Sequence, residues 1–283
     1  MTERPHFGEE GRLQKEVDKY FPTIAIHRAD QKNVGDMNSR PDLYFKWLNP
    51  TKIVDIEDSN FSQIAREFEN STIVVGGGGL LFEGSFPEIY GRNFSSLYQS
   101  SRKLLVAWGI GHNNHGGENI RLPDLDMYDI AGIRGGSKYH WVPCSSCLSP
   151  ILDEEYPINH DVVFFRHKFH PFPEITTDGG IPTMDNSENN INEAIRFIAS
   201  GETVLTNSYH GAYWGILLGR KVVIIDPFST KFQGLKWKVP VISASNWQSA
   251  LSETRIYPEA LNESREANNN FADLVRNLLA THE

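Results

Sequence analysis

Residues 203–226 read TVLTNSYHGAYWGILLGRKVVIID, and this stretch decides the fold of the chain. Its first residues, 203–205, predict a short buried strand. The apolar segment 212–218 predicts a compact helix that ends at Gly219, a residue type favoured just past a helix. Residues 221–225 predict a second buried strand. Strand, helix and strand in this order predict a parallel βαβ unit.

His210 lies in the first turn of this predicted helix, after Asn207 and Ser208, which are residue types that favour helix starts. Unpaired backbone N–H groups and the helix dipole make such a place suitable for an anion. In α/β proteins, ligands bind at the carboxyl ends of parallel strands. The pattern therefore predicts a functional His210, and the alternative is a histidine that only caps the helix or packs in the core.

The composition is that of a globular protein. The chain has 283 residues, 39% apolar and 22% charged, which suits one large domain or two of about 130–150 residues. The net charge of -9 argues against a general nucleic-acid binder. No apolar run is long enough to cross a membrane, and the polar N-terminus lacks a signal-peptide layout. We expect a cytoplasmic protein, with peripheral membrane association left open and the oligomeric state undetermined.

Short apolar runs alternate with helical patterns along the whole chain. The predicted strands are residues 23–27, 52–56, 72–75, 104–108, 128–133, 162–166, 203–205, 221–225 and 239–242. The predicted helices are residues 41–48, a segment capped by Ser59, and residues 93–101, 192–200, 212–218, 246–253 and 271–280. Alternation of this kind predicts an α/β fold with mostly parallel sheets covered on both faces.

Residues 135–159 are rich in Gly, Ser, Pro and Cys and predict the crossing between two domains. We expect an N-terminal Rossmann-like domain, residues 1–150, and a C-terminal one, residues 151–283, that face a cleft. The final helix is expected to pack back on the N-terminal domain. Cys144 and Cys147 lie in this crossing and are interpreted as reduced loop thiols, with a redox or metal role as the alternatives.

Two glycine motifs follow strands of the first domain. In Asn33-Val34-Gly35-Asp36, the glycine lets the backbone approach a ligand, and Asp36 suits hydrogen bonds to sugar hydroxyls or a role as base. The alternative is a helix start capped by Asp36. The run Gly76–Gly79 leaves backbone N–H groups bare for an anion or a substrate, or serves only a tight turn. It is neither a dinucleotide fingerprint nor a P-loop.

Cationic and histidine residues follow later strands. Arg134 suits a bidentate grip on phosphate or carboxylate, and the alternative is an interdomain salt bridge. Lys231 could hold an anion, and the alternative is plain solvation. His112 and His115 stand three apart after a glycine pair, but no acidic third ligand is close, so no metal site is predicted.

In this order, the motifs resemble the polysaccharide pyruvyltransferase family over about residues 22–240. The match is carried by Asn33-x-Gly35-Asp36, by IVVGGGGLLF at 73–82, by a glycine-rich segment at 108–111 and by TNSYHGAYWGILLGRKVV at 206–223, together with Arg134 and Lys231. The resemblance implies a GT-B-like fold and transfer of a pyruvyl group from phosphoenolpyruvate to a saccharide as a ketal, in exopolysaccharide biosynthesis. The acceptor would be linked to a lipid or a nucleotide, and no cofactor is implied beyond this co-substrate.

The resemblance also assigns roles to residues. The catalytic group would be His210, Arg134 and Asp36. The donor would be bound by Ser208, Tyr209, Gly211 and Lys231. The acceptor would be bound by Asn33, Gly35, Gly77 and Gly78.

One departure from the family pattern is Ser208, which stands where the family has an arginine two residues before the histidine. Arg166, Arg220 and Lys221 are candidates to replace that cation. Two other functions stay open. One is a nucleotide-sugar glycosyltransferase of the same fold, for which Asp226 would hold a ribose. The other is a non-catalytic carbohydrate-binding relative.

Overall fold

The computed structural model describes residues 22–82, 88–115, 125–135, 138–170, 175, 180–187 and 190–282. The N-terminus considered above for a signal sequence, and part of the segment after Arg134, lie outside these residues.

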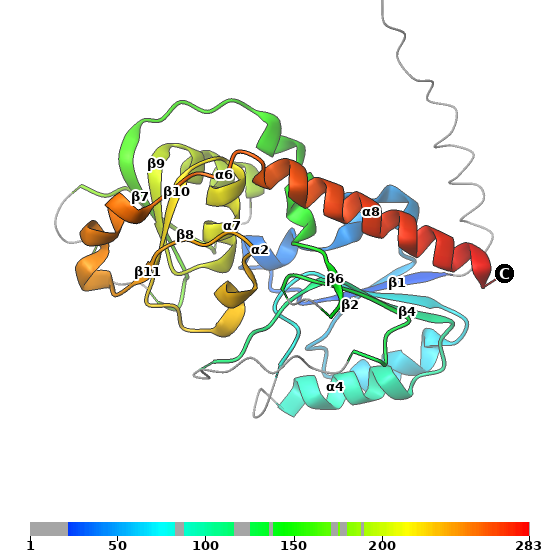
Figure 1. The fold of residues 1–283 in the computed structure, drawn as a ribbon. Coiled ribbons are helices and arrows are strands. Elements are labelled where there is room, and N and C mark those ends of the chain that lie inside the picture. Colours follow the sequence, from blue (N-terminus) through cyan, green and yellow to red (C-terminus); the bar gives the residue numbers. More distant parts are fainter. Residues whose placement is uncertain are drawn as a thin grey trace, which may run out of the picture.

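The first sheet has six parallel strands (Figure 1). They are β1 (Thr23–His27), β2 (Lys52–Asp55), β3 (Thr72–Gly76), β4 (Leu104–Ile110), β5 (Ile130–Ile133) and β6 (His140–Trp141), in the order β2-β1-β3-β4-β5-β6. Alternate residues of β4 face opposite cores: Leu105 packs with one apolar cluster, and Leu104 and Trp108 pack with another. Both faces of the sheet are therefore covered, which explains why its strands read as continuous apolar runs.

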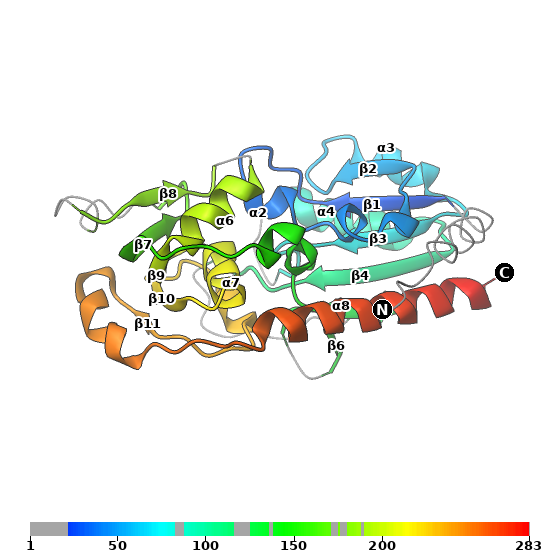
Figure 2. The ribbon, with the colours of Figure 1, turned by 90° about the horizontal axis from the view of Figure 1, so that it is seen from above.

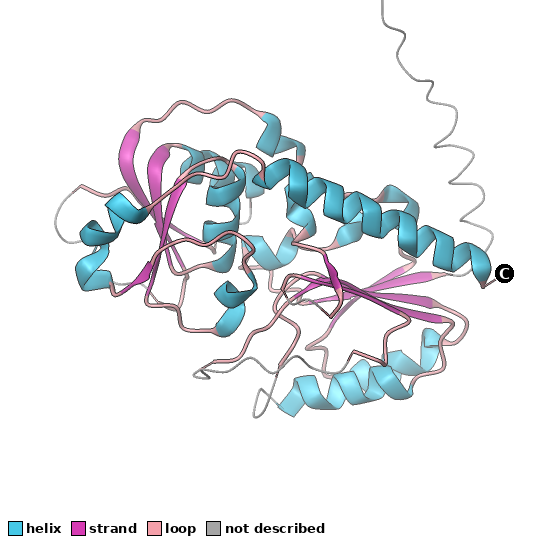
Figure 3. Cartoon of the chain, viewed as in Figure 1, coloured by secondary structure: helices cyan, strands magenta, loops and turns pink. Residues whose placement is uncertain are grey.

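The second sheet has five parallel strands, shown with the first in Figure 3. They are β7 (His160–Arg166), β8 (Thr183–Asp185), β9 (Gly201–Thr206), β10 (Lys221–Ile225) and β11 (Val241–Ile242), in the order β11-β10-β9-β7-β8. In each sheet the first strand of the chain is an inner strand, and the second strand lies beside it at one edge. The later strands follow on the other side of the first strand, toward the opposite edge. The prediction of two Rossmann-like α/β units of GT-B-like architecture is confirmed, and the strand order reverses between β1 and β3 and between β7 and β9.

The helices cover these sheets. They are α2 (Val34–Met37), α3 (Phe61–Ile64), α4 (Glu88–Gln99), α6 (Ile191–Ala199), α7 (Tyr209–Leu217) and α8 (Ala260–Thr281), with 3-10 turns at η1 (Pro41–Leu43), η2 (Lys46–Leu48), η3 (Ala65–Phe68), η4 (Ser145–Leu148), η5 (Pro150–Asp153), η6 (Thr230–Gly234) and η7 (Ala244–Glu253). The expected helix over residues 41–48 is wrong, because the chain there makes two 3-10 turns and leaves in a left-handed conformation at Asn49.

Helix α8 joins the two units along its length (Figure 2). Ala260, at its start, packs in the core of the second unit, whereas Phe271 and Val275 pack on the face of the first sheet beside Trp108. The helix is twice as long as expected, because residues 261–270 are mainly polar and hide its first half from an apolar-periodicity argument. No helix in the described ranges is both long and apolar enough to cross a membrane.

Candidate functional site

A crevice lies where the two reversal points of strand order face each other. Its lining from the first unit is Asn33, Asp36, Gly79 and Arg134, and from the second unit His167, Asn186, Ser208, Tyr209, His210, Phe228, Lys231 and Phe232. These residues follow the carboxyl ends of strands in both sheets, where doubly wound proteins bind ligands. The crevice is narrow. The volume within it that the centre of a water molecule can occupy is only about 20 Å³. That is room for about one water.

His210 is held at the crevice by contact with the loop after β1. The residue lies in the first turn of α7 and is 6% exposed. A Cβ atom on Gly35 would stand 2.0 Å from His210 Nδ1, so only glycine allows the two units to meet here. Burial, and then the charges of Arg134 and Lys231, hold the pKa of His210 well below its usual 6.5. The imidazole is therefore neutral at neutral pH.

Arg134 brings a buried guanidinium to the crevice from the end of β5. Its Nε donates to the carbonyl oxygen of Gly109 at 2.7 Å, and its Cζ lies 4.6 Å from the ring centre of Tyr209. The side chain is 3% exposed, yet its Nη2 has no hydrogen-bond partner in the described part of the chain. A buried guanidinium donor without a partner is costly unless an anion completes the site.

Asp36 and Lys231 face the same crevice from opposite units. Burial raises the pKa of Asp36, and the nearby charge of Lys231 opposes this rise. Burial lowers the pKa of Lys231, and Asp36 opposes that shift. Asn33 accepts hydrogen bonds from the backbone N–H groups of Gly35 and Asp36, and its Nδ2 donates to Asp36 Oδ2 at 2.8 Å. Asn33 is thus the helix cap, and the alternative of a cap by Asp36 is wrong.

The glycines proposed for binding occupy different positions. Gly79 lines the crevice, where an added Cβ would lie 2.8 Å from Lys231 Cε. Gly77 and Gly78 lie outside that lining and take left-handed backbone conformations, with φ of 73° and 81°. Gly211 lies behind the crevice, where an added Cβ would stand 2.4 Å from Thr206 Oγ1, so it serves close packing of helix on strand.

None of the three cations suggested as replacements for the family arginine lines the crevice. Arg220 donates to the carbonyl oxygens of Ala199 and Tyr156, and Lys221 pairs with Glu202, all at the opposite end of the second sheet. Arg166 lies at the correct end but pairs with Asp185 at 3.6 Å.

Sequence reasoning missed four residues of the lining: His167, Asn186, Phe228 and Phe232. Burial, followed by the charge of Lys231, lowers the pKa of His167 to about 3. His167 directly follows a predicted strand, so its position was a usable signal. Asn186 follows β8, a strand of three residues that is too short to give a periodic pattern.

Cys144 and Cys147 are free thiols buried under α7 and α8. No group of three or more His, Cys, Asp and Glu side chains within the described ranges could hold a metal ion. Cys144 Sγ lies 3.5 Å from His210 Nε2, a contact that its distance in sequence concealed.

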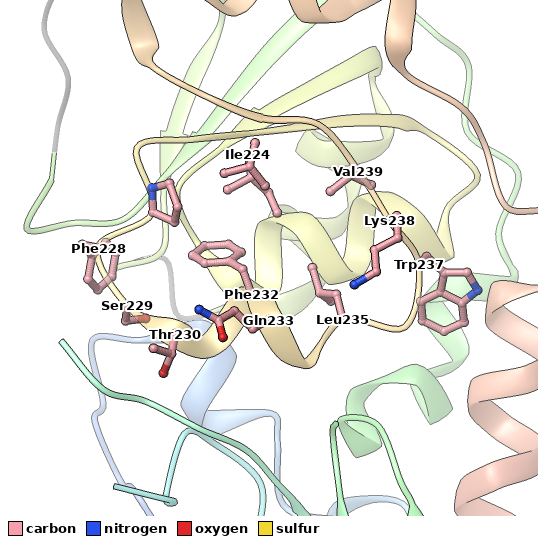
Figure 4. Close-up of a pocket in the computed structure, with 12 residues that line it drawn as sticks. Ile224, Phe228, Ser229, Thr230, Phe232, Gln233, Leu235, Trp237, Lys238 and Val239 are labelled. Carbon is pink, nitrogen blue, oxygen red and sulfur yellow. The ribbon is translucent and has the colours of Figure 1, made fainter. Parts of the chain in front are cut away.

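A second and larger cavity, of about 790 Å³, opens inside the loop that follows β10 (Figure 4). Its lining is Ile224, Pro227, Phe228, Ser229, Thr230, Phe232, Gln233, Leu235, Trp237, Lys238, Val239 and Val241. We call this cavity the bowl. Phe228 and Phe232 belong to both linings, so they form the wall between the bowl and the crevice.

Comparison with known proteins finds similarity only at the level of solved structures. No family model matches the sequence, and no curated protein matches it. Among solved structures, the chain is similar to a functionally uncharacterized protein from Klebsiella pneumoniae subsp. pneumoniae NTUH-K2044. The identity is 17%, the TM-score 0.49, and the match covers 80% of this chain and 91% of that one. This similarity identifies neither a family nor an activity.

Proposed function

We propose that the protein transfers the pyruvyl group of phosphoenolpyruvate to two hydroxyls of a saccharide, forming a ketal in the assembly of a cell-surface polysaccharide. The observation that carries the proposal is the buried guanidinium of Arg134, a residue that lines the crevice and whose Nη2 has no hydrogen-bond partner among the described residues. The ordered motifs shared with polysaccharide pyruvyltransferases point to the same chemistry.

The charges of the crevice suit a small anion. Arg134 and Lys231 bring two cations against the single carboxylate of Asp36, in a place shielded from solvent. Coulombic attraction there is several times stronger than in water. Phosphoenolpyruvate carries both a carboxylate and a phosphate, so it would satisfy both cations at once.

The reaction balances without an external oxidant or reductant. Two C–O bonds form between the acceptor oxygens and C2 of the enolpyruvyl group, and the bond from C2 to the phosphate oxygen breaks. One hydroxyl proton ends on the methylene carbon, which becomes a methyl group. The other ends on the released phosphate. The protein must therefore supply a proton to carbon and accept one from oxygen.

Asp36 is the group best suited to carry these protons. Burial raises the pKa of its carboxyl, so it holds a proton more readily than an exposed aspartate does. The pKa of His210 lies well below its usual value because of burial and nearby cations, so the ring is neutral and poorly suited to deliver a proton to carbon. This assignment gives His210 a binding role and Asp36 the acid and base role.

Substrate entry requires the two units to separate, because the crevice has room for about one water. Hydrogen bonds across the rim would have to open, among them the following. Lys168 Nζ donates to Asp30 Oδ2 at 2.7 Å, Val34 N to the carbonyl oxygen of Asn186 at 3.0 Å, and Asn114 N to Thr230 Oγ1 at 2.9 Å. Closure over the substrate would exclude water from the reaction.

The nucleotide-sugar alternative gains no support from Asp226. Its carboxylate accepts a hydrogen bond from the backbone N–H of Ala244 at 2.8 Å, and it does not line the crevice. The carboxylate therefore already has a structural role.

Calorimetric titration of the native protein tests the proposal. Phosphoenolpyruvate should bind more tightly than inorganic phosphate, and UDP- and GDP-sugars should give no heat. Phosphate release should then depend on an added saccharide. Tight binding of a nucleotide sugar would favour the glycosyltransferase, and binding of saccharides alone would favour the non-catalytic relative.

A further inference from the structure

Three consecutive hydrogen bonds join Trp214 to His210 beneath the crevice. Trp214 Nε1 donates to Ser146 Oγ at 2.9 Å, and Ser146 Oγ donates to Cys144 Sγ at 3.2 Å. Cys144 Sγ then lies 3.5 Å from His210 Nε2. All four side chains are buried. We call this series the relay.

The helical period of α7 builds the relay. His210, Tyr213 and Trp214 stand at positions i, i+3 and i+4, so they share the helix face that meets the loop at 144–147. The hydroxyl of Tyr213 donates to the carbonyl oxygen of Cys144 at 3.0 Å and anchors that loop. The positions of the sulfur and of the serine hydroxyl are therefore set by the same helix that carries His210.

The direction of the relay follows from its first member. An indole N–H is only a donor, so Ser146 Oγ accepts from Trp214 and directs its own hydrogen to Cys144 Sγ. Cys144 Sγ accepts the hydrogen bond from Ser146, so its own thiol hydrogen is available to donate. His210 Nε2 is the acceptor within reach of that hydrogen. We infer that the relay holds His210 as the tautomer with hydrogen on Nδ1, and that Trp214, Ser146 and Cys144 are positioning residues.

The ring of His210 lines the crevice, and its hydrogen bond within the described residues is made by Nε2. Nδ1 is the ring atom nearest to a Cβ placed on Gly35. In this tautomer it donates, so its partner is an acceptor such as a phosphate or carboxylate oxygen. That consequence rests on the proposed function, whereas the tautomer itself does not. Arg134 lines the same crevice and its Nη2 has no partner among the described residues, so an anion bound there would receive one N–H donor from each unit.

Long-range ¹H–¹⁵N correlation spectra of the native protein, labelled at histidine nitrogens, test the tautomer at pH 7. We expect the His210 signals to show a protonated Nδ1 and an unprotonated Nε2. A protonated Nε2, whether alone or together with Nδ1, would overturn the inference. The native spectrum decides this without any variant.

Variants then test the relay as the cause. Cys144→Ala and Trp214→Phe should each convert the single tautomer of His210 into a mixture. Each variant removes a donor that sets the direction of the hydrogen bonds in the relay. Cys147→Ala is the matched control: its thiol is equally buried, three residues away, and its sulfur receives a hydrogen bond from Asn268 instead. An unchanged tautomer in Cys144→Ala would refute the role of the thiol.

Titration of the labelled protein with phosphoenolpyruvate separates this inference from the proposed function. A shift of the Nδ1 proton signal on addition would support both. If the native spectrum shows hydrogen on Nδ1 and phosphoenolpyruvate leaves that spectrum unchanged, the inference about the relay stands. The same result would count against phosphoenolpyruvate as the substrate that supplies the pyruvyl group.

Discussion

The crevice and the bowl share two phenylalanines but differ in volume and in the charge of the residues that line them. The bowl is about 790 Å³ and the crevice about 20 Å³. The bowl is mostly apolar, and its single charged lining residue among those described is Lys238. The crevice collects Arg134, Lys231, Asp36 and His210. The larger cavity is therefore not the one whose residues are suited to catalysis. Buried charged side chains, and not cavity volume, identify the candidate site.

The difference comes from how each cavity is made. One loop of the second unit encloses the bowl, so its shape depends on local packing. The crevice forms only where loops from two sheets meet, and each sheet reverses its strand order there. A site shared between two bodies can close on its ligand, and its free volume in the closed state says little about the ligand that it takes.

The largest expected effect comes from Gly35→Ala. The added Cβ would stand 2.0 Å from His210 Nδ1, so the loop after β1 must move away from α7. We expect loss of phosphoenolpyruvate binding and about 1–3 kcal/mol lower stability from overpacking. Calorimetric titration and urea unfolding measure the two effects. Gly91→Ala is the control, because a Cβ there meets nothing within 4 Å and should stabilise α4 by about 0.5–1 kcal/mol.

Arg134→Lys should weaken phosphoenolpyruvate binding by roughly 30-fold, because lysine keeps the charge but loses the planar pair of donors. About 2 kcal/mol, the low end for truncation of a buried charged contact, corresponds to that factor. Calorimetric titration measures it. Arg196→Lys, on the exposed face of α6, should leave binding unchanged. Equal affinities of Arg134→Lys and the native protein would remove Arg134 from the anion site.

The crevice should also make stability depend on pH. The pKa of His167 falls from 6.5 to about 3 on folding, mainly through burial. Between these values the unfolded chain takes up a proton that the folded chain does not, so stability is lost as pH falls below 6.5. His167→Gln should remove about 1–2 kcal/mol of the loss between pH 7 and pH 5.

Urea unfolding at the two pH values measures this loss. His160→Gln, at the exposed start of β7, is the matched control and should leave the pH dependence as it is in the native protein. An equal change in both variants would show that the environment of His167 in the crevice does not cause the effect.

The smallest expected effect is in the bowl. Lys238→Ala should change phosphoenolpyruvate affinity less than about twofold, since an exposed cation outside the crevice is screened by water and salt. The same titration measures it. A loss comparable to that of Arg134→Lys would reverse the comparison and place the anion in the bowl.

The architecture could be predicted because each element carried its own signal. Apolar runs of three to five residues identified β1, β3, β4 and β10. The turns at residues 41–48 and the polar half of α8 were misjudged, because their conformation depends on packing against distant residues. Two-residue β6 and three-residue β8 carried too little pattern to be found.

Within the site, position after a strand predicted His210, Arg134, Asp36 and Lys231, because parallel strands bring their carboxyl ends to one edge. It could not predict that Gly35 packs on the ring of His210, or that Cys144 lies against its Nε2. Those contacts join segments that are 175 and 66 residues apart, and no local pattern records them.

The sequence by itself determined two parallel sheets and the kinds of side chain that follow their strands, since hydrophobic periodicity and turn residues are local properties. Only the tertiary structure decided which of those side chains meet, which donor of Arg134 lacks a partner and which nitrogen of His210 lies against Cys144. The physical reason is that burial and hydrogen-bond direction depend on the packing of one unit against the other.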